Sequence, residues 1–202
     1  DFDDTITIGN VSTLIREAFA PDEWREMEKE FYAGKYSVEE SNVRQFALVR
    51  ASAEQIEELL STRVEVRDGF EEFVEYCETE DIRFVVVSSG LALYVNPTMR
   101  RTGLAHVEAH AATTTFSPDG LGVSYTGPSG EPIGSGFKDS FARHFKSQGY
   151  RTVYIGDGLC HVVPRKNLID SFNRTISSGN SINSHAQCFK GASHMFGNRA
   201  QT

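Results

Sequence analysis

The chain opens with the stretch Asp1-Phe2-Asp3-Asp4-Thr5, in which two carboxylates stand two residues apart. The residues that follow, Ile6 to Asn10, change quickly from apolar to polar. This change places the acids at the end of an extended segment, which is where open α/β sheets put their ligand chemistry. Packing alone does not account for two carboxylates at this spacing. We therefore interpret the stretch as a candidate reaction centre.

Length and composition narrow the class of protein. A chain of 202 residues fits one domain, or one domain with a modest insertion. With 39% hydrophobic and 24% charged residues it has the composition of a soluble globular protein. No apolar run approaches the length of a membrane span, and no leader pattern is present. The net charge of -8 disfavours nucleic-acid binding, whereas a small anionic substrate is compatible with it if a metal supplies local positive charge.

The cysteines bear on location. Cys77, Cys160 and Cys188 are an odd number and have no CxxC spacing, which argues against a disulfide framework and against a zinc site. The sequence therefore predicts a cytoplasmic protein.

Four short helical patterns follow the opening stretch, at residues 10–20, 21–34, 37–50 and 52–60. In the first, apolar residues recur every three or four positions behind the capping residue Asn10. Ser37 and Ser52 each begin a capping-box pattern. We predict that residues 10–66 form a helical cap inserted into an α/β core made of residues 1–9 and 67–158.

Strands and helices alternate in the rest of this core. We expect a helix from Asp68, a helix at 91–101 that Pro97 kinks or interrupts, and a helix at 138–148. Buried strands are predicted at 82–87 and 152–155, and a β-hairpin at 107–126 with its turn at 118–120. This alternation predicts an α/β fold with a Rossmann-like parallel sheet.

Polar side chains of complementary chemistry stand at the predicted strand ends and helix starts. A carboxylate such as Asp1 can attack phosphorus, and a second carboxylate, Asp3, can protonate the leaving oxygen and then activate water. Asp157 offers a hard oxygen ligand for Mg²⁺. Lys138 can neutralise charge on the transferring group, and Ser88 can hydrogen-bond a phosphoryl oxygen. Two simpler roles stay open, because Lys146 competes with Lys138 in the same helix and Ser88 can act as a helix cap.

The order DFDDT, VVVSSG, a lysine and YIGDG resembles the haloacid dehalogenase superfamily of phosphatases. The resemblance implies that Asp1 is the nucleophile and Asp3 the general acid and base. It implies that Mg²⁺ is the cofactor, bound by Asp1, by the backbone carbonyl of Asp3 and by Asp157.

The same resemblance assigns the phosphate-binding groups. Ser88 and Lys138 are implied to be catalytic residues that also bind the substrate, together with Ser89 and Gly90. The substrate is expected to be a small phosphorylated metabolite.

The position of the predicted cap resembles the phosphoserine-phosphatase-like subgroup. Within it, FAPDEW at 19–24 and RDGF at 67–70 look most like the 2-hydroxy-3-keto-5-methylthiopentenyl-1-phosphate phosphatases of methionine salvage. Phosphoserine is the alternative substrate, which would place an Arg and a Glu of the cap against the amino acid.

The resemblance breaks after Asp157. The family pattern GDGxxD has a second acid where this chain has His161, and residues 159–202 carry five bases and one acid, 5 - 1 = +4. We expect an atypical tail over 159–202, disordered or misread, and a core truncated at both ends, since no apolar strand precedes Asp1. A further alternative is therefore an inactive, truncated or frame-shifted fragment.

Overall fold

A three-stranded sheet occupies the centre of the computed structural model, which describes residues 1–157. Its order is β3-β4-β5. Strand β3 (Val85–Leu91) runs parallel to β4 (Glu108–Ser117), which pairs antiparallel with β5 (Gly120–Ser124). The hairpin predicted at 107–126 is confirmed, and it makes the sheet mixed where a parallel one was expected. The register shifts between Val87 and Leu91, so β3 runs on through Ser88-Ser89-Gly90 instead of stopping before them.

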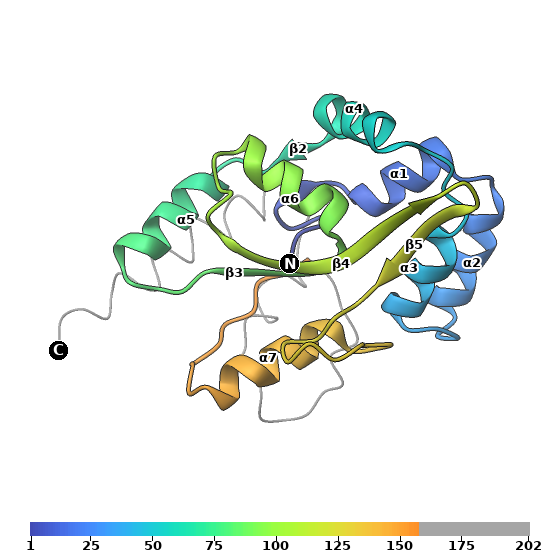
Figure 1. Cartoon of the computed structure of the whole chain (residues 1–202). Helices are drawn as coiled ribbons and strands as arrows, with labels where there is room; N and C mark the ends of the chain where they lie inside the picture. The colour runs from blue at the N-terminus through green and yellow to red at the C-terminus, as the bar shows by residue number, and fades with distance from the viewer. Residues whose placement is uncertain (158–202) are drawn as a thin grey trace.

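Helices cover both faces of the sheet. In Figure 1, α5 (Phe70–Thr79) and α6 (Ala92–Arg101) lie above it and α7 (Phe137–Ser147) lies below it. The apolar positions of α5 and α7 are buried against the sheet, which is the packing that an amphipathic helix gives. Of the two effects predicted for Pro97, a kink or an interruption, the structure excludes the interruption, because α6 continues through Pro97. The chain therefore forms an α/β layer structure around β3.

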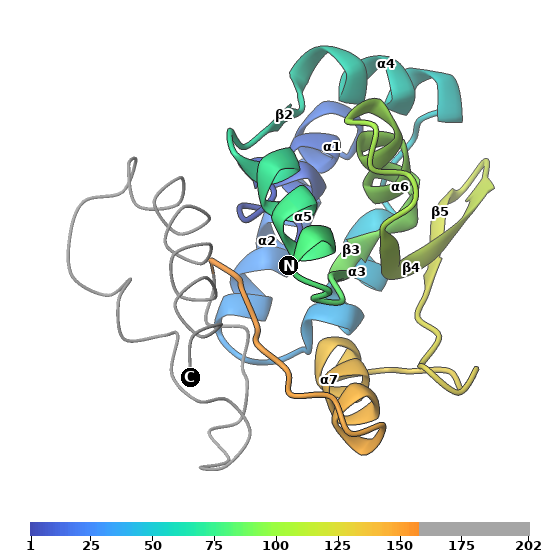
Figure 2. The same ribbon diagram turned by 90° about the vertical axis from the view of Figure 1, so that its left-hand side faces the viewer.

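Four helices lie between two short strands, β1 (Thr7–Ile8) and β2 (Glu65–Val66). They are α1 (Val11–Phe19), α2 (Glu23–Tyr32), α3 (Val38–Phe46) and α4 (Ala53–Arg63), called the helical segment below. Because β1 and β2 pair antiparallel, the chain leaves the sheet region and returns to it at one point. In Figure 2, α4 and α1 lie in the upper part of the molecule, whereas α2 and α3 lie at mid-height, near the level of β3.

Local capping explains where these helices begin. Asn10 Oδ1 accepts a hydrogen bond from Thr13 N at 2.9 Å. Ser37 and Ser52 both form complete capping boxes, as predicted. Such caps satisfy backbone N–H groups that the first helical turn leaves without partners.

A buried cation stands inside the helical segment. The guanidinium of Arg16 lies over the rings of Trp24 and Phe46, at 5.1 and 5.7 Å from their centroids, and 3.5 Å from Glu28. The rings and the carboxylate together offset the cost of removing this charge from water.

The segment 152–155 does not form the predicted strand. The structure gives it no regular secondary structure and leaves Thr152 and Val153 exposed. A strand needs a ladder of backbone hydrogen bonds to a neighbour. The segment instead accepts a bond from Asp1 N on Ile155 O at 3.0 Å. The predicted tail, with His161, lies outside the described residues.

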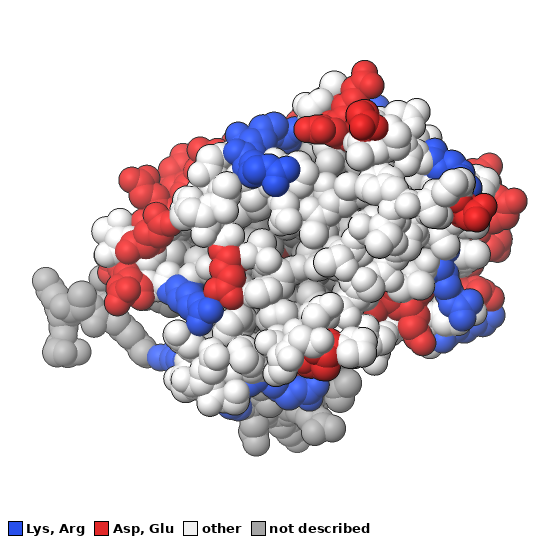
Figure 3. Space-filling model, in the orientation of Figure 1, with Lys and Arg blue, Asp and Glu red and all other residues white. Residues whose placement is uncertain are grey.

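The charged side chains are unevenly spread. On the face shown in Figure 3, acidic groups gather over α5, α2 and α4 at the rim, while the surface over the sheet is largely uncharged. None of the helices within residues 1–157 combines the length and the apolar character of a transmembrane span.

Candidate active site

The carboxylate of Asp1 is enclosed by donors from three parts of the chain. Its Oδ1 accepts a hydrogen bond from Phe2 N at 2.7 Å and lies 2.7 Å from Lys138 Nζ. Its Oδ2 accepts a hydrogen bond from the Tyr154 hydroxyl at 3.2 Å. With 7% of the side chain exposed, this carboxylate is fixed in position and its negative charge is compensated.

Lys138, and not Lys146, is the lysine that reaches Asp1. It is the second residue of α7, and its Nζ also lies 3.4 Å from the Tyr154 hydroxyl. Lys146 lies in the last turn of the same helix and is exposed. The side chains of Asp1 and Lys138 therefore form a nearly buried ion pair.

The Asp3 carboxylate is directed to another set of partners. Its Oδ1 accepts a hydrogen bond from Val11 N, the first residue of α1, at 2.7 Å. Its Oδ2 accepts one from the Tyr94 hydroxyl at 2.6 Å, and that hydroxyl lies 2.7 Å from Ser12 Oγ. Asp1 and Asp3 thus occupy different surroundings although only one residue separates them.

Burial dominates the acidity of the Asp3 side chain. Loss of water raises the pKa of the Asp3 carboxyl above its ordinary value, and the hydrogen bonds from Tyr94 and Val11 oppose that rise. The pKa of Tyr94 is raised as well, by its burial and by the nearby Asp3 charge. Tyr94 is therefore a neutral hydrogen-bond donor. The Asp3 carboxyl takes up a proton more readily than the carboxyl of a solvated aspartate.

Ser88, Ser89 and Gly90 lie at the end of β3, beside Asp3. The Ser88 hydroxyl accepts a hydrogen bond from Gly90 N at 3.0 Å, within β3. It does not cap α6, whose N-cap residue is Leu91 and has no side-chain cap. Gly90 packs so closely that a Cβ there would overlap the Tyr94 hydroxyl and approach Asp3 Oδ2 to 2.8 Å. This close approach requires glycine.

The carbonyl of Ser89 is held from the helical segment and from the core together. It accepts hydrogen bonds from Asn42 Nδ2 at 2.8 Å and from the Tyr125 hydroxyl at 2.6 Å. Asn42 Nδ2 also donates to the Tyr125 hydroxyl at 3.0 Å. A buried network of this kind fixes the backbone between Ser88 and Gly90.

Asp157 is tied to the opening stretch through Thr5. Asp157 N donates to Thr5 Oγ1 at 3.0 Å, and that hydroxyl lies 3.3 Å from Asp157 Oδ1. Because Asp1 N also donates to Ile155 O, the first and last described segments run side by side. Asp1 and Asp157 are thereby brought to one edge of the fold.

Arg67 holds the loop that carries the opening acids. Its Nε donates to Thr5 O and its Nη2 to Asp4 O, both at 3.0 Å. Asp4 has φ +57°, a left-handed conformation that is strained for a residue with a side chain. The guanidinium therefore stabilises a turn that the backbone alone disfavours.

The oxygen donors at this edge suit a hard divalent cation. The carboxylates of Asp1 and Asp157 and the backbone carbonyl of Asp3, the set predicted from the sequence, are ligand types that Mg²⁺ takes alongside water. The two oxygens of the Asp3 side chain accept hydrogen bonds from Val11 N and the Tyr94 hydroxyl. Within residues 1–157 no three His, Cys, Asp or Glu side chains converge on one point.

Sequence reasoning had missed four contributors to the site: Thr5, Tyr94, Tyr154 and Asn42. Tyr94 and Asn42 lie on helix faces that hydrophobic periodicity assigns to the core. Periodicity does not distinguish a buried side chain that only packs from one that also makes a directed hydrogen bond. Tyr154 and Thr5 lie inside the motifs YIGDG and DFDDT. Their hydroxyl groups, next to the predicted acids, were the signal that could have identified them as hydrogen-bond partners.

Comparison with known proteins gives the same family along the described chain. The model of haloacid dehalogenase-like hydrolases matches residues 1–159. The 2-hydroxy-3-keto-5-methylthiopentenyl-1-phosphate phosphatase of Brevibacillus brevis is 28% identical over 171 residues, covering 82% of this chain and 77% of the relative. The enzyme of the same name from Bacillus mycoides is 27% identical, covering 86% and 81%.

Solved structures agree on the fold. A phosphoserine phosphatase with an analogue of its phospho-aspartyl intermediate aligns with a TM-score of 0.56 and 24% identity, covering 78% of this chain and 76% of that one. A substrate-bound phosphoserine phosphatase complex gives a TM-score of 0.57 at 24% identity, covering 78% and 75%. At this identity the likeness is one of fold.

Proposed function

The chain belongs to the haloacid dehalogenase-like hydrolase family, and on that premise we propose that it is a Mg²⁺-dependent phosphatase that forms an aspartyl phosphate on Asp1. The observation that carries the proposal is the division of partners between the two acids. Asp1 is paired with Lys138 at 2.7 Å, as a nucleophile facing an anionic substrate requires. Asp3, two residues on, is buried beside a neutral hydroxyl.

In the first step an oxygen of Asp1 attacks phosphorus. The new O–P bond forms while the bond from phosphorus to the leaving alkoxide breaks, and the Asp3 carboxyl gives its proton to that alkoxide. Lys138 lies beside Asp1 Oδ1 and compensates charge on the phosphoryl oxygens. A Mg²⁺ held by Asp1, Asp157 and the Asp3 carbonyl would supply further positive charge to the phosphoryl group.

In the second step the Asp3 carboxylate accepts a proton from water. The water oxygen attacks the aspartyl phosphate, the O–P bond to Asp1 breaks, and inorganic phosphate leaves. The carboxylate of Asp1 and the protonated carboxyl of Asp3 are both restored. Ser88, Ser89 and Gly90 are assigned to the phosphoryl oxygens because they follow one another at the end of β3, where Gly90 packs against Asp3.

The proposed substrate is 2-hydroxy-3-keto-5-methylthiopentenyl-1-phosphate, the compound in the names of the two curated relatives. The helical segment would serve as the cap that closes over it and excludes water, on a core formed by 1–9 and 67–158. We also propose a cytoplasmic location, for which the predicted absence of a disulfide framework is the support.

Release of inorganic phosphate tests the proposal. Wild-type protein and Asp1→Asn are assayed on p-nitrophenyl phosphate with Mg²⁺ and with EDTA, and then on a panel that includes the methylthio compound and phosphoserine. We expect turnover that requires both Mg²⁺ and Asp1, with the highest kcat/KM on the methylthio compound. A folded wild-type protein without metal-dependent turnover contradicts the reaction and favours the inactive alternative. Preference for phosphoserine contradicts only the substrate.

A further inference from the structure

Helix α3 contacts the catalytic side of the fold at two backbone points. Asn42 Nδ2 donates to Ser89 O at 2.8 Å, next to Ser88. Glu39 Oε1 accepts a hydrogen bond from Phe137 N at 2.9 Å, next to Lys138. Both side chains are buried, with 3% of Glu39 and 6% of Asn42 exposed. The Asn42 contact is therefore made to a residue assigned to the phosphate, and the Glu39 contact lies one residue from another.

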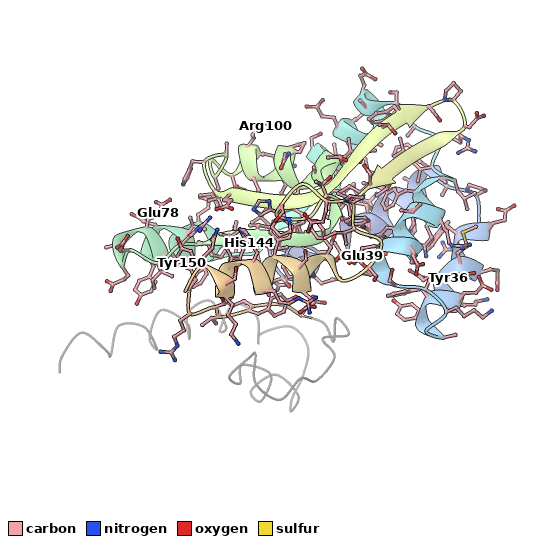
Figure 4. All side chains as sticks on the ribbon, turned by 60° about the horizontal axis from the view of Figure 1, so that its bottom comes forward. Tyr36, Glu39, Glu78, Arg100, His144 and Tyr150 are labelled. Carbon is pink, nitrogen blue, oxygen red and sulfur yellow. The ribbon has the colours of Figure 1, made fainter. Side chains whose placement is uncertain are left out.

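The Glu39 contact supplies a hydrogen-bond acceptor for the first turn of α7, which the residue before that helix does not provide. The residue before α7 is Gly136, which has no side chain and offers no cap. The first N–H groups of a helix need acceptors and carry partial positive charge. A carboxylate from α3 meets that need from 98 residues away, and Figure 4 shows Glu39 between α3 and the beginning of α7.

From these contacts, and resting on the proposed function, we propose that Glu39 and Asn42 are positioning residues of α3. They set the places of the Lys138 side chain and of the Ser88–Gly90 backbone, and they do not themselves touch the substrate. The phosphate-binding groups then adopt their working positions only while α3 is docked on the core. Movement of the helical segment and assembly of the phosphate site become one event.

A third contact shows that this docking involves the loop before α7. Ser37 Oγ, at the beginning of α3, donates to Gly134 O at 3.2 Å. Hydrogen bonds thus join α3 to residues 134 and 137 on one side and to residue 89 on the other. A displacement of about 1 Å at a catalytic group can cost on the order of a hundredfold in rate, so small shifts of α3 are expected to matter.

The test measures affinity for inorganic phosphate by titration calorimetry in Mg²⁺ buffer, beside kcat and KM for p-nitrophenyl phosphate. Glu39→Ala and Glu39→Asp remove the contact, the second by shortening the side chain while keeping its charge. Glu39→Gln retains Oε1 as an acceptor and is the rescue variant. Glu40→Ala is the matched control, because it opens the capping box of α3 at Ser37 and leaves Glu39 in place.

We expect Glu39→Ala, Glu39→Asp and Asn42→Ala to weaken phosphate binding at least fivefold and to lower kcat about tenfold. Glu39→Gln and Glu40→Ala should stay within about twofold of wild type in phosphate binding. Hydrogen exchange at the Phe137 amide should rise in Glu39→Ala and not in Glu39→Gln. If Glu39→Ala does not fold, the pair Glu39→Asp and Glu39→Gln decides.

Three outcomes overturn the inference. In one, Glu39→Ala binds phosphate as the wild type does; in another, Glu40→Ala or Glu39→Gln loses as much affinity as Glu39→Ala; in the third, the wild-type protein binds no phosphate. A wild-type protein that binds phosphate yet hydrolyses nothing contradicts the proposed function alone. In that case the phosphate affinities of the variants still test the positioning role of Glu39 and Asn42.

Discussion

The hydroxyl of Tyr94 lies 2.6 Å from Oδ2 of Asp3, across 91 residues of sequence. The same hydroxyl lies 2.7 Å from Ser12 Oγ, so Tyr94 joins α6, α1 and the opening stretch. In its proposed role Asp3 gives and takes a proton in turn, which needs a fixed orientation toward the leaving group. Tyr94 and Val11 N together provide that orientation.

Tyr94→Phe is expected to lower kcat on p-nitrophenyl phosphate about tenfold with little change in KM. The ring stays in the core, where Tyr94 is fully buried, while the hydrogen bond to Asp3 is lost. A hydrogen bond to a charged group contributes about 1.5–3 kcal/mol, so urea unfolding should show a loss in that range. Tyr76→Phe is the control, because no partner for the Tyr76 hydroxyl is found among the described residues. An unchanged kcat in Tyr94→Phe would show that Val11 N alone is enough.

Gly90→Ala should abolish activity and destabilise the fold. A Cβ at residue 90 would overlap the Tyr94 hydroxyl and meet Asp3 Oδ2 at 2.8 Å, so one of the two must move. Overpacking of this kind costs about 1–3 kcal/mol. Gly134→Ala is the matched control, since no atom lies within 4 Å of its Cβ position. Thermal melting and phosphate release are measured for both, and full activity of Gly90→Ala would refute the close packing.

Arg67→Ala is expected to reduce both stability and activity. Its guanidinium donates to the carbonyls of Asp4 and Thr5, and without it the left-handed turn at Asp4 loses its support. We expect a loss of about 2 kcal/mol in urea unfolding, by the cost of a partner removed from a part-buried polar group. Arg63→Ala, an exposed arginine at the end of α4, should change stability by less than about 0.5 kcal/mol. Equal losses in the two variants would contradict the role given to Arg67.

The sequence was sufficient to predict those elements whose position depends on an interaction between near neighbours in the chain. The beginnings of α1, α3 and α4 follow from Asn10, Ser37 and Ser52, because each cap bonds to a backbone group three residues away. The hairpin was predictable for the same reason, since its turn joins neighbours in sequence.

Features that depend on contacts between residues far apart in the sequence could not be predicted. Whether 152–155 becomes a strand depends on which segment lies beside it, and periodicity carries no information on that neighbour. Likewise Lys138 and Lys146 stand on one helix, and only the direction of α7 decides which reaches Asp1. The Tyr94 contact with Asp3 belongs to this class.

Cys77 gives a pH dependence independent of the active site. Burial, and secondarily the charge of Glu78, raises the pKa of the Cys77 thiol from 9.0 to about 11. The folded protein thus holds this proton more tightly than the unfolded chain, and its contribution to stability is complete below pH 9 and declines as the pH rises toward 11. We expect Cys77→Ala to unfold with a shallower loss of stability than wild type over that interval.

Urea unfolding between pH 8 and pH 11 measures this difference. Iodoacetamide labelling with mass spectrometry supplies a second measurement, because only the thiolate reacts. Cys77 should stay unmodified in the native protein at pH 8 and react once urea unfolds it. Rapid labelling of native Cys77 would contradict its burial.

Lys138→Ala should reduce kcat/KM on p-nitrophenyl phosphate at least a hundredfold, whereas Lys146→Ala should leave it unchanged. The Lys138 ammonium lies 2.7 Å from Asp1 Oδ1, so in the proposed reaction it stands beside the phosphoryl oxygens and compensates their charge. Lys138→Arg should restore little, because a planar guanidinium cannot occupy the position of a compact ammonium between Asp1 and Tyr154.

The same three variants separate catalysis from stability. Removing Lys138 leaves a carboxylate that is 7% exposed without its ion-pair partner, so Lys138→Ala should also lose about 1–3 kcal/mol in urea unfolding. Lys138→Arg keeps the positive charge and should recover most of that stability while staying slow. Recovery of both properties in Lys138→Arg would mean that any cation suffices beside Asp1, and that the position of the ammonium contributes nothing to the reaction.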